Sequence, residues 1–128
     1  MKLLGIHHVA IISSNYMISK RFYTEILKLV IVSEVYRDDR DSYKLNLRVP
    51  DGTEIELFSF PSPPLRPSYP EACGLRHLAF AVEDLAQTVA ELQSHDVSVE
   101  DIRVDEFTGK RFTFFADPDG LPLELYEL

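Results

Sequence analysis

The 128-residue chain has little cysteine, little positive charge and no long apolar run. Its single cysteine, Cys73, excludes an internal disulfide and a zinc site built from cysteines. No stretch approaches the ~18 consecutive apolar residues of a membrane-spanning helix. Only 13 Lys and Arg stand against 21 Asp and Glu, which gives a net charge of -8. Because an acidic chain repels nucleic acid and anionic lipid, we expect neither as a partner.

The remaining composition is typical of one globular domain. Hydrophobic residues make up 45% of the chain and charged residues 27%, and the length suits a single domain. Residues 1–5 lead into a patterned strand and lack the layout of a secretory signal. We therefore expect a single domain, residues 1–128, located in the cytoplasm.

The chain repeats itself. Residues 50–58 read PDGTEIELF and residues 118–126 read PDGLPLELY, an offset of 68 positions. Residues 8–11, HVAI, resemble residues 77–80, HLAF, at an offset of 69. Two echoes at nearly the same offset indicate a duplicated module.

Hydrophobic periodicity predicts the element order β-α-β-β-β in both modules. Five prolines in residues 61–70 predict an extended connector between them. Module 1 (about 4–60) has strands at 5–13, 30–37, 42–49 and 53–60. It also has an amphipathic helix at roughly 16–28, predicted because Ile18, Phe22, Ile26 and Leu29 recur at helical spacing. After the connector (61–72), module 2 (about 73–128) has strands at 75–82, 97–100, 111–116 and 121–127 and a helix that follows Asp84.

Four polar side chains occupy matched positions in these apolar strands. Taken singly, each would be a structural or solvated residue, but the repeat places a histidine and a glutamate together twice. Burying two unpaired carboxylates costs several kcal/mol each and calls for a compensating charge. Two imidazoles and two carboxylates suit Ni, Zn, Co, Mn or Fe(II). We therefore predict that one divalent transition metal is held by His8, Glu56, His77 and Glu124, with two positions open for substrate or water.

The predicted fold is α+β, with the two βαβββ modules forming a curved mixed sheet around a metal-binding cleft.

This pattern of His, Glu, His and Glu on a duplicated βαβββ module resembles the vicinal oxygen chelate superfamily. That superfamily includes glyoxalase I, extradiol dioxygenases and bleomycin-resistance proteins. The second half, notably residues 74–80 and 111–126, is similar to a bacterial glyoxalase-like subgroup.

The resemblance implies a metal-dependent lyase or isomerase similar to lactoylglutathione lyase. It would act on a small α-hydroxycarbonyl or thiol adduct by proton transfer through a metal-bound enediolate, with Glu124 as the base and Glu56 as a second proton carrier. Two alternatives stay open. One is an Fe(II)-dependent extradiol-type dioxygenase using His8, His77 and Glu124, and the other is a non-catalytic, resistance-type binder of a small molecule.

Two positions differ from glyoxalase I, which usually has Arg four residues after the first ligand and Asn four residues after the second. Ile12 and Phe60 stand at these positions, so both polar contacts to glutathione are replaced by apolar groups. A smaller substrate or another thiol adduct fits better.

The partners implied are a small-molecule substrate and a second copy of the chain. Small members of the family usually form homodimers, with the metal site inside one chain or across two. An anionic substrate group has four candidate cations, each of which is otherwise a solvated surface charge: Arg66, Arg76, Lys110 and Arg111.

Overall fold

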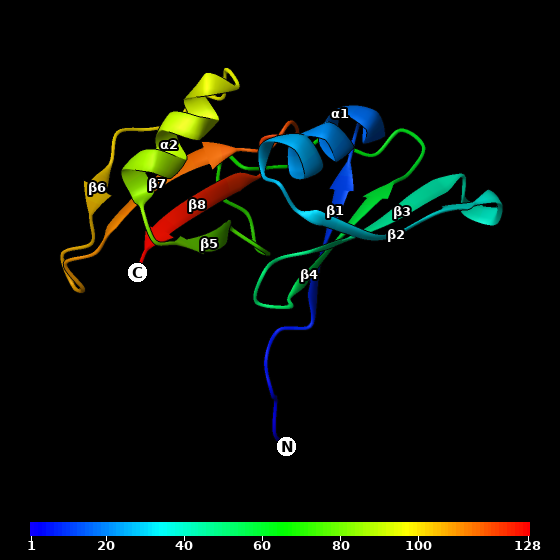
Figure 1. Cartoon of the computed structure of the whole chain (residues 1–128). Coiled ribbons are helices and arrows are strands. Elements are labelled where there is room, and N and C mark those ends of the chain that lie inside the picture. Colours follow the sequence, from blue (N-terminus) through cyan, green and yellow to red (C-terminus); the bar gives the residue numbers. More distant parts are fainter. The chain divides into compact units, whose positions relative to one another are not determined.

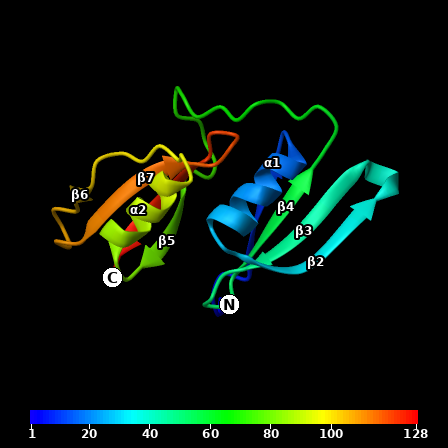
Figure 2. The ribbon, with the colours of Figure 1, turned by 45° about the horizontal axis from the view of Figure 1, so that its top comes forward.

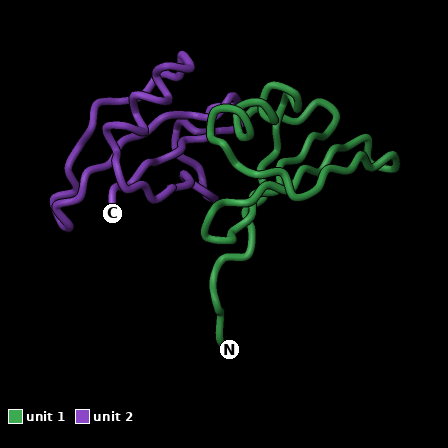
Figure 3. Tube along the Cα trace, viewed as in Figure 1, with its two compact units in different colours: residues 1–65 green, residues 66–128 purple.

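The computed structural model describes residues 1–128 as two compact units, Met1–Leu65 (unit 1) and Arg66–Leu128 (unit 2) (Figure 3). The boundary falls inside the predicted connector. Each unit contains one four-stranded mixed sheet and one α-helix, in the order strand, helix, three strands (Figure 1). The predicted α+β class and the duplicated βαβββ module are confirmed. No helix is both long and apolar enough to cross a membrane.

Unit 1 has the strand order β1-β4-β3-β2, in which β1 runs parallel to β4 and the other pairs are antiparallel. Asn15 caps the first helix, since its Oδ1 accepts a hydrogen bond from the Ile18 N–H. The elements are β1 (His8–Ser13), α1 (Tyr16–Arg21), the π-helix η1 (Phe22–Ile26), β2 (Val30–Arg37), the 3₁₀ helix η2 (Asp38–Arg40), β3 (Ser42–Arg48) and β4 (Glu54–Ser59).

Unit 2 repeats this topology with the strand order β5-β8-β7-β6, and β5 is again parallel to β8. The predicted strand bounds are reproduced for β7 and differ by one residue at the start of β8. The elements are β5 (Leu78–Val82), α2 (Leu85–Ser94), β6 (Arg103–Val104), β7 (Arg111–Ala116) and β8 (Pro122–Glu127).

One face of each sheet is buried under its helix. The helix α1 packs against β4 in unit 1, and α2 packs against β8 in unit 2 (Figure 2). Strand side chains alternate between faces, so alternate residues form the two cores. These buried residues include Leu45, Leu47, Ile55 and Leu57 in unit 1 and Thr113, Phe115, Leu123 and Leu125 in unit 2. The side chains between them lie on the opposite face of each sheet, which carries the candidate site.

The buried face of the first helix differs from the prediction. Ile18 was expected in the core, but it is 54% exposed, whereas Tyr16 and Ser19 are buried. The helix changes at Phe22 into a π-helix, where the Leu27 N–H bonds to the Phe22 carbonyl five residues back. A wider turn shifts the phase of all the residues that follow, so a single 3.6-residue period cannot describe the segment.

The predicted strand at residues 97–100 is wrong. The structure places the edge strand β6 at Arg103–Val104, paired with Phe112 and Arg111 of β7. Residues 97–100 are hydrogen-bonded to β7 at Glu100, whose N–H donates to the Phe114 carbonyl at 2.9 Å and whose carbonyl accepts from the Thr113 hydroxyl at 2.7 Å. One backbone hydrogen bond does not make a ladder, although the apolar alternation of this segment resembles a strand.

The cap of α2 gives a first test of the fold. Asp84 Oδ1 accepts a hydrogen bond from the Gln87 N–H at 2.9 Å. Asp84→Ala should lower the free energy of unfolding by about 1 kcal/mol, because an N–H at the helix start loses its acceptor. Asp84→Asn keeps a capping oxygen and should lie close to wild type. Urea unfolding followed by circular dichroism measures both, and an equal loss in the two variants would contradict the capping role.

Glu127 gives a second test, based on pH. Its carboxylate accepts hydrogen bonds from Arg111 at 3.0 and 2.8 Å and from the Leu85 N–H at 3.0 Å, and these hold the pKa of Glu127 below its usual value of 4.5. A lowered pKa in the folded state means that stabilisation is present above pH 4.5 and is lost as the pH falls through the lower folded value. Glu127→Gln should therefore be less stable than wild type at pH 7, and the difference should narrow in acid. Urea midpoints from pH 7 to pH 3 measure it, with the exposed Glu106→Gln as the control. A constant difference across this range would contradict the prediction.

Candidate metal centre

The first predicted ligand pair lies on the open face of the unit 1 sheet. The parallel register pairs Ala10 of β1 with Glu56 of β4, and His8 precedes Ala10 by two residues on the same strand face. His8 Nε2 lies 3.5 Å from Glu56 Oε1. The glutamate side chain is only 14% exposed, whereas the histidine side chain is 42% exposed.

Glu56 has two further polar neighbours from β3. Asn46 Nδ2 donates to Glu56 Oε2 at 3.1 Å and to Glu54 Oε1 at the same distance. Lys44 Nζ lies 3.5 Å from Glu56 Oε2. The carboxylate of Glu56 is therefore held by an imidazole, an amide and an ammonium group.

The second pair lies on the corresponding face of unit 2. The register pairs Ala79 of β5 with Glu124 of β8, and His77 stands two residues before Ala79. His77 Nε2 lies 2.9 Å from Glu124 Oε2, and the two side chains are 32% and 12% exposed. Here the β7 residue in register is Phe114, whose ring meets the His77 ring edge-on at 5.0 Å. Glu124 therefore has one polar partner and an aromatic neighbour.

The donor set fits a divalent transition metal. Two ligand atoms bound to one ion at about 2.1 Å, with bond angles between tetrahedral and octahedral values, lie roughly 3.0–3.4 Å apart. The observed separations of 3.5 and 2.9 Å are close to this range. Neither pair belongs to a cluster of three or more His, Cys, Asp or Glu side chains that could hold a metal ion. The His7 ring, whose Nδ1 lies 2.9 Å from His8 Nδ1, does not complete such a cluster. The joining of all four residues around one ion stays a prediction.

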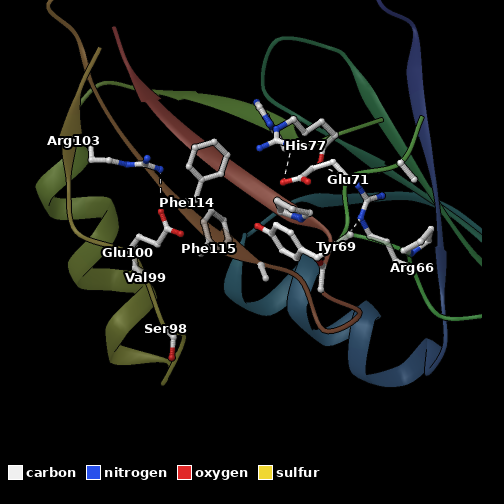
Figure 4. A pocket seen from close by; sticks show the side chains of 17 residues that line it. Arg66, Tyr69, Glu71, His77, Ser98, Val99, Glu100, Arg103, Phe114 and Phe115 are labelled. Atoms are coloured by element: carbon white, nitrogen blue, oxygen red, sulfur yellow. Dashed lines mark hydrogen bonds and ion pairs between the residues drawn. The ribbon is translucent and has the colours of Figure 1, made fainter. Parts of the chain in front are cut away.

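A cavity of about 680 Å³ opens beside His77 in unit 2, and we call it the His77 cavity (Figure 4). Phe114 and Tyr69 form part of its wall. Arg66 also borders it, but its guanidinium donates to the carbonyls of Leu75 at 2.6 Å and Arg76 at 3.0 Å. Arg66 thereby anchors the connector to the segment before β5.

Four cationic side chains are predicted as candidates to bind an anionic substrate group. Three of them are held by other partners or are largely exposed to solvent. Arg66 binds backbone carbonyls, and Arg111 is paired with Glu127 at 2.8 Å. Arg76 borders the cavity but is 68% exposed, with a loose ion pair to Glu71 at 3.9 Å. These contacts were not readable from the sequence, because they depend on how the connector folds back and on the β7–β8 pairing.

Three residues near the ligand pairs were missed: Lys44, Asn46 and Arg103. Asn46 and Lys44 alternate with buried leucines, which indicates only an outward face. Their contact with Glu56 follows from the β3–β4 register, which pairs Asn46 with Glu56. Arg103 belongs to the edge strand that the hydrophobic pattern misplaced, so no sequence signal marked it.

Comparisons with known proteins agree with this architecture. The family model described as "Glyoxalase/Bleomycin resistance protein/Dioxygenase superfamily" matches residues 5–125. The chain is 62% identical over 125 residues to the uncharacterized protein YaeR of Escherichia coli strain K12, covering 98% of this chain and 97% of YaeR. The crystal structure of SMU.1112c matches with a TM-score of 0.95 at 46% identity, covering 98% and 100% of the two chains. A glyoxalase family protein from Enterococcus faecalis matches with a TM-score of 0.92 at 50% identity, covering 99% and 100%.

The same fold occurs at lower identity in proteins with different described functions. A lactoylglutathione lyase from Agrobacterium tumefaciens and TnmS3, an antibiotic binding protein from Streptomyces sp. CB03234, each share 18% identity with the chain, at TM-scores of 0.73 and 0.75. These two likenesses concern the fold alone. The family match covers nearly the whole length, and the relatives with high identity share the fold from end to end. The chain therefore belongs to the glyoxalase/bleomycin resistance protein/dioxygenase superfamily, the vicinal oxygen chelate group.

Proposed function

We propose that the chain is a divalent-metal-dependent lyase or isomerase of the glyoxalase type, which moves a proton next to a carbonyl of a small α-hydroxycarbonyl or thiol adduct. The observation that carries the proposal is the double His–Glu pair at equivalent register positions of two repeated sheets. The recurrence of a histidine beside a nearly buried glutamate on both open faces supports a shared role for the two pairs.

His8, Glu56, His77 and Glu124 are the residues that would hold the metal. When bound, the metal supplies a Lewis acid that polarises two neighbouring oxygens of the substrate and stabilises negative charge as a carbon-bound proton leaves. The two histidines orient the site from the starts of equivalent strands.

The two glutamates have different surroundings, which supports different roles. Glu56 is fixed by Asn46 and Lys44 in addition to its histidine. Glu124 contacts only His77 and otherwise faces Phe114, so its carboxylate can turn toward a substrate more easily. We assign Glu124 as the base that takes the carbon-bound proton, because a base needs a carboxylate that can turn toward the substrate. Glu56 is the second proton carrier, with its position kept by β3.

Aromatic side chains border Glu124 and would limit the access of water. Phe114 lies in register with Glu124, and Phe112 stacks on Tyr126 with ring centroids 6.4 Å apart. The Tyr126 hydroxyl donates to Asp105 at 3.0 Å, so its polar end is already bound. An apolar border strengthens the interaction between the carboxylate and charge that develops on a substrate, because fewer water molecules screen it.

The surroundings of Ile12 and Phe60 support a substrate other than a standard glutathione adduct. Ile12 is 54% exposed near the end of β1, and Phe60 stacks on Phe58 with ring centroids 5.9 Å apart. Neither residue offers a hydrogen bond to a peptide-like substrate tail. A smaller substrate without such a tail needs no hydrogen bond at these two positions.

Metal content is the first test. Protein purified without chelator should carry close to one equivalent of a divalent transition metal per site, as measured by mass spectrometry. His77→Ala should lose most of it, because one of four donors is removed. His95→Ala is the matched control, since His95 is an exposed histidine that ends α2. No metal in the wild type, and none taken up from Ni, Co, Zn, Mn or Fe(II), would refute the proposal.

The role of Glu124 is tested by proton exchange. Metal-loaded protein is incubated in D2O with hemithioacetals of methylglyoxal and either 2-mercaptoethanol, cysteine or glutathione, and deuterium at the substrate carbon is followed by NMR. Glu124→Gln should reduce the exchange rate at least about 100-fold, because the base is removed. Glu83→Gln, an exposed glutamate at the end of β5, should exchange at the wild-type rate. Full exchange by a Glu124→Gln protein that still binds metal would overturn the assignment.

A further inference from the structure

The His77 cavity contains a second feature that the proposed chemistry does not use: an arginine set on an aromatic wall. Arg103, Phe114 and His77 all border this cavity (Figure 4). The feature lies wholly in unit 2, and Glu124 contacts the histidine at its other end.

Arg103 is positioned by the pairing of the edge strand. It lies opposite Phe112 in the β6–β7 register, and its guanidinium carbon stands 5.0 Å from the Phe112 ring centroid and 5.5 Å from that of Phe114. Stacking on two rings fixes the plane of a guanidinium and limits its rotation. Arg103 is therefore more strongly oriented than an ordinary surface arginine, although its side chain is 54% exposed and open to a ligand.

The guanidinium of Arg103 retains binding capacity. One of its terminal nitrogens donates to Glu100 Oε2 at 3.0 Å, and Glu100 is 61% exposed. An exposed ion pair between residues three apart is weak and easily rearranged. A guanidinium has five N–H donors in a fork that matches a carboxylate, so further donors remain for a ligand.

Phe114 links this arginine to the proposed metal ligands. Its ring lies 5.5 Å from the Arg103 guanidinium carbon and 5.0 Å from the His77 ring. His77 and Arg103 therefore both contact the Phe114 ring, and a substrate that placed two oxygens beside His77 and Glu124 would reach Arg103 by extending along that ring. The other cavity arginines do not offer this arrangement, because Arg66 is bound to backbone carbonyls and Arg76 pairs loosely with Glu71.

We propose that Arg103 binds a terminal carboxylate of the substrate, so that the substrate class is an α-hydroxycarbonyl or thiol adduct carrying one carboxylate a few bonds from its chelating oxygens. This inference rests on the proposed function, since it uses His77 and Glu124 as the chelating end. A singly charged carboxylate suits the position better than a phosphate dianion, because Glu100 adjoins the same guanidinium.

The test uses two hydroxamates as probes, since a hydroxamate chelates a divalent ion through two neighbouring oxygens. One is the monohydroxamate of glutaric acid, and the other is its neutral counterpart with a terminal carboxamide. Calorimetric titration of nickel-loaded wild-type protein should show about tenfold tighter binding of the carboxylate probe. Arg103→Gln should bind both probes equally, with the affinity for the carboxamide probe unchanged. Arg103→Lys should keep part of the preference, because the charge remains while the fork is lost.

Arg76→Gln is the matched control, since Arg76 borders the same cavity, and it should keep the wild-type preference. Equal binding of the two probes to the wild type, or an undiminished preference in Arg103→Gln, would overturn the role of Arg103 while leaving the metal centre intact. Failure of the carboxamide probe to bind nickel-loaded protein more tightly than metal-free protein would instead refute the proposed function, and the inference with it.

Discussion

The parallel pairing of the first and last strands in each module is the constraint on which the candidate site depends. It sets Ala10 beside Glu56 and Ala79 beside Glu124, so a histidine two residues earlier on the neighbouring strand reaches the carboxylate. A one-residue slip in either pairing would move the glutamate to the helix-covered face. That face is closed by a fully buried core, which includes Leu57 and Leu123. The strand register that buries this core therefore also places the candidate ligands on the opposite face.

The two modules share a backbone plan and differ in the strand beside the glutamate. In unit 1 the β3 neighbours are Asn46 and Lys44, which hold Glu56 through a hydrogen bond and an ion pair. In unit 2 the equivalent strand supplies phenylalanines, and Phe114 replaces the amide. Duplication thus gives two His–Glu pairs at equivalent register positions. Divergence gives one carboxylate held by polar neighbours and one with an apolar neighbour and a cavity beside its histidine. A reaction that needs both a ligand and a movable base uses this asymmetry.

The sequence predicted what depends on local pattern and on the repeat. Runs rich in β-branched and aromatic residues located β2 and β7 with their observed bounds, and the two Asp-Gly turns stand where Gly52 and Gly120 adopt positive φ angles. The sequence could not predict the π-helix after α1, because a change of helical period inside one segment leaves no mark in a fixed-period pattern. The two His–Glu pairs were predictable because the repeat matched them, and their role as metal ligands stays a prediction. The place of Arg103 depends on a two-residue strand whose pairing is decided by tertiary structure.

The distribution of charge is compatible with the proposed anionic substrate, although the chain as a whole is acidic. The net charge of -8 repels anions at long range, yet the His77 cavity is bordered by three arginines and only two glutamates, Glu71 and Glu100. Repulsion between exposed charges is screened beyond about 8–10 Å at physiological ionic strength, so a small anion at the mouth of the cavity interacts mainly with this local set. The proposed binding of one carboxylate beside the candidate metal ligands is therefore compatible with the acidic net charge of the chain.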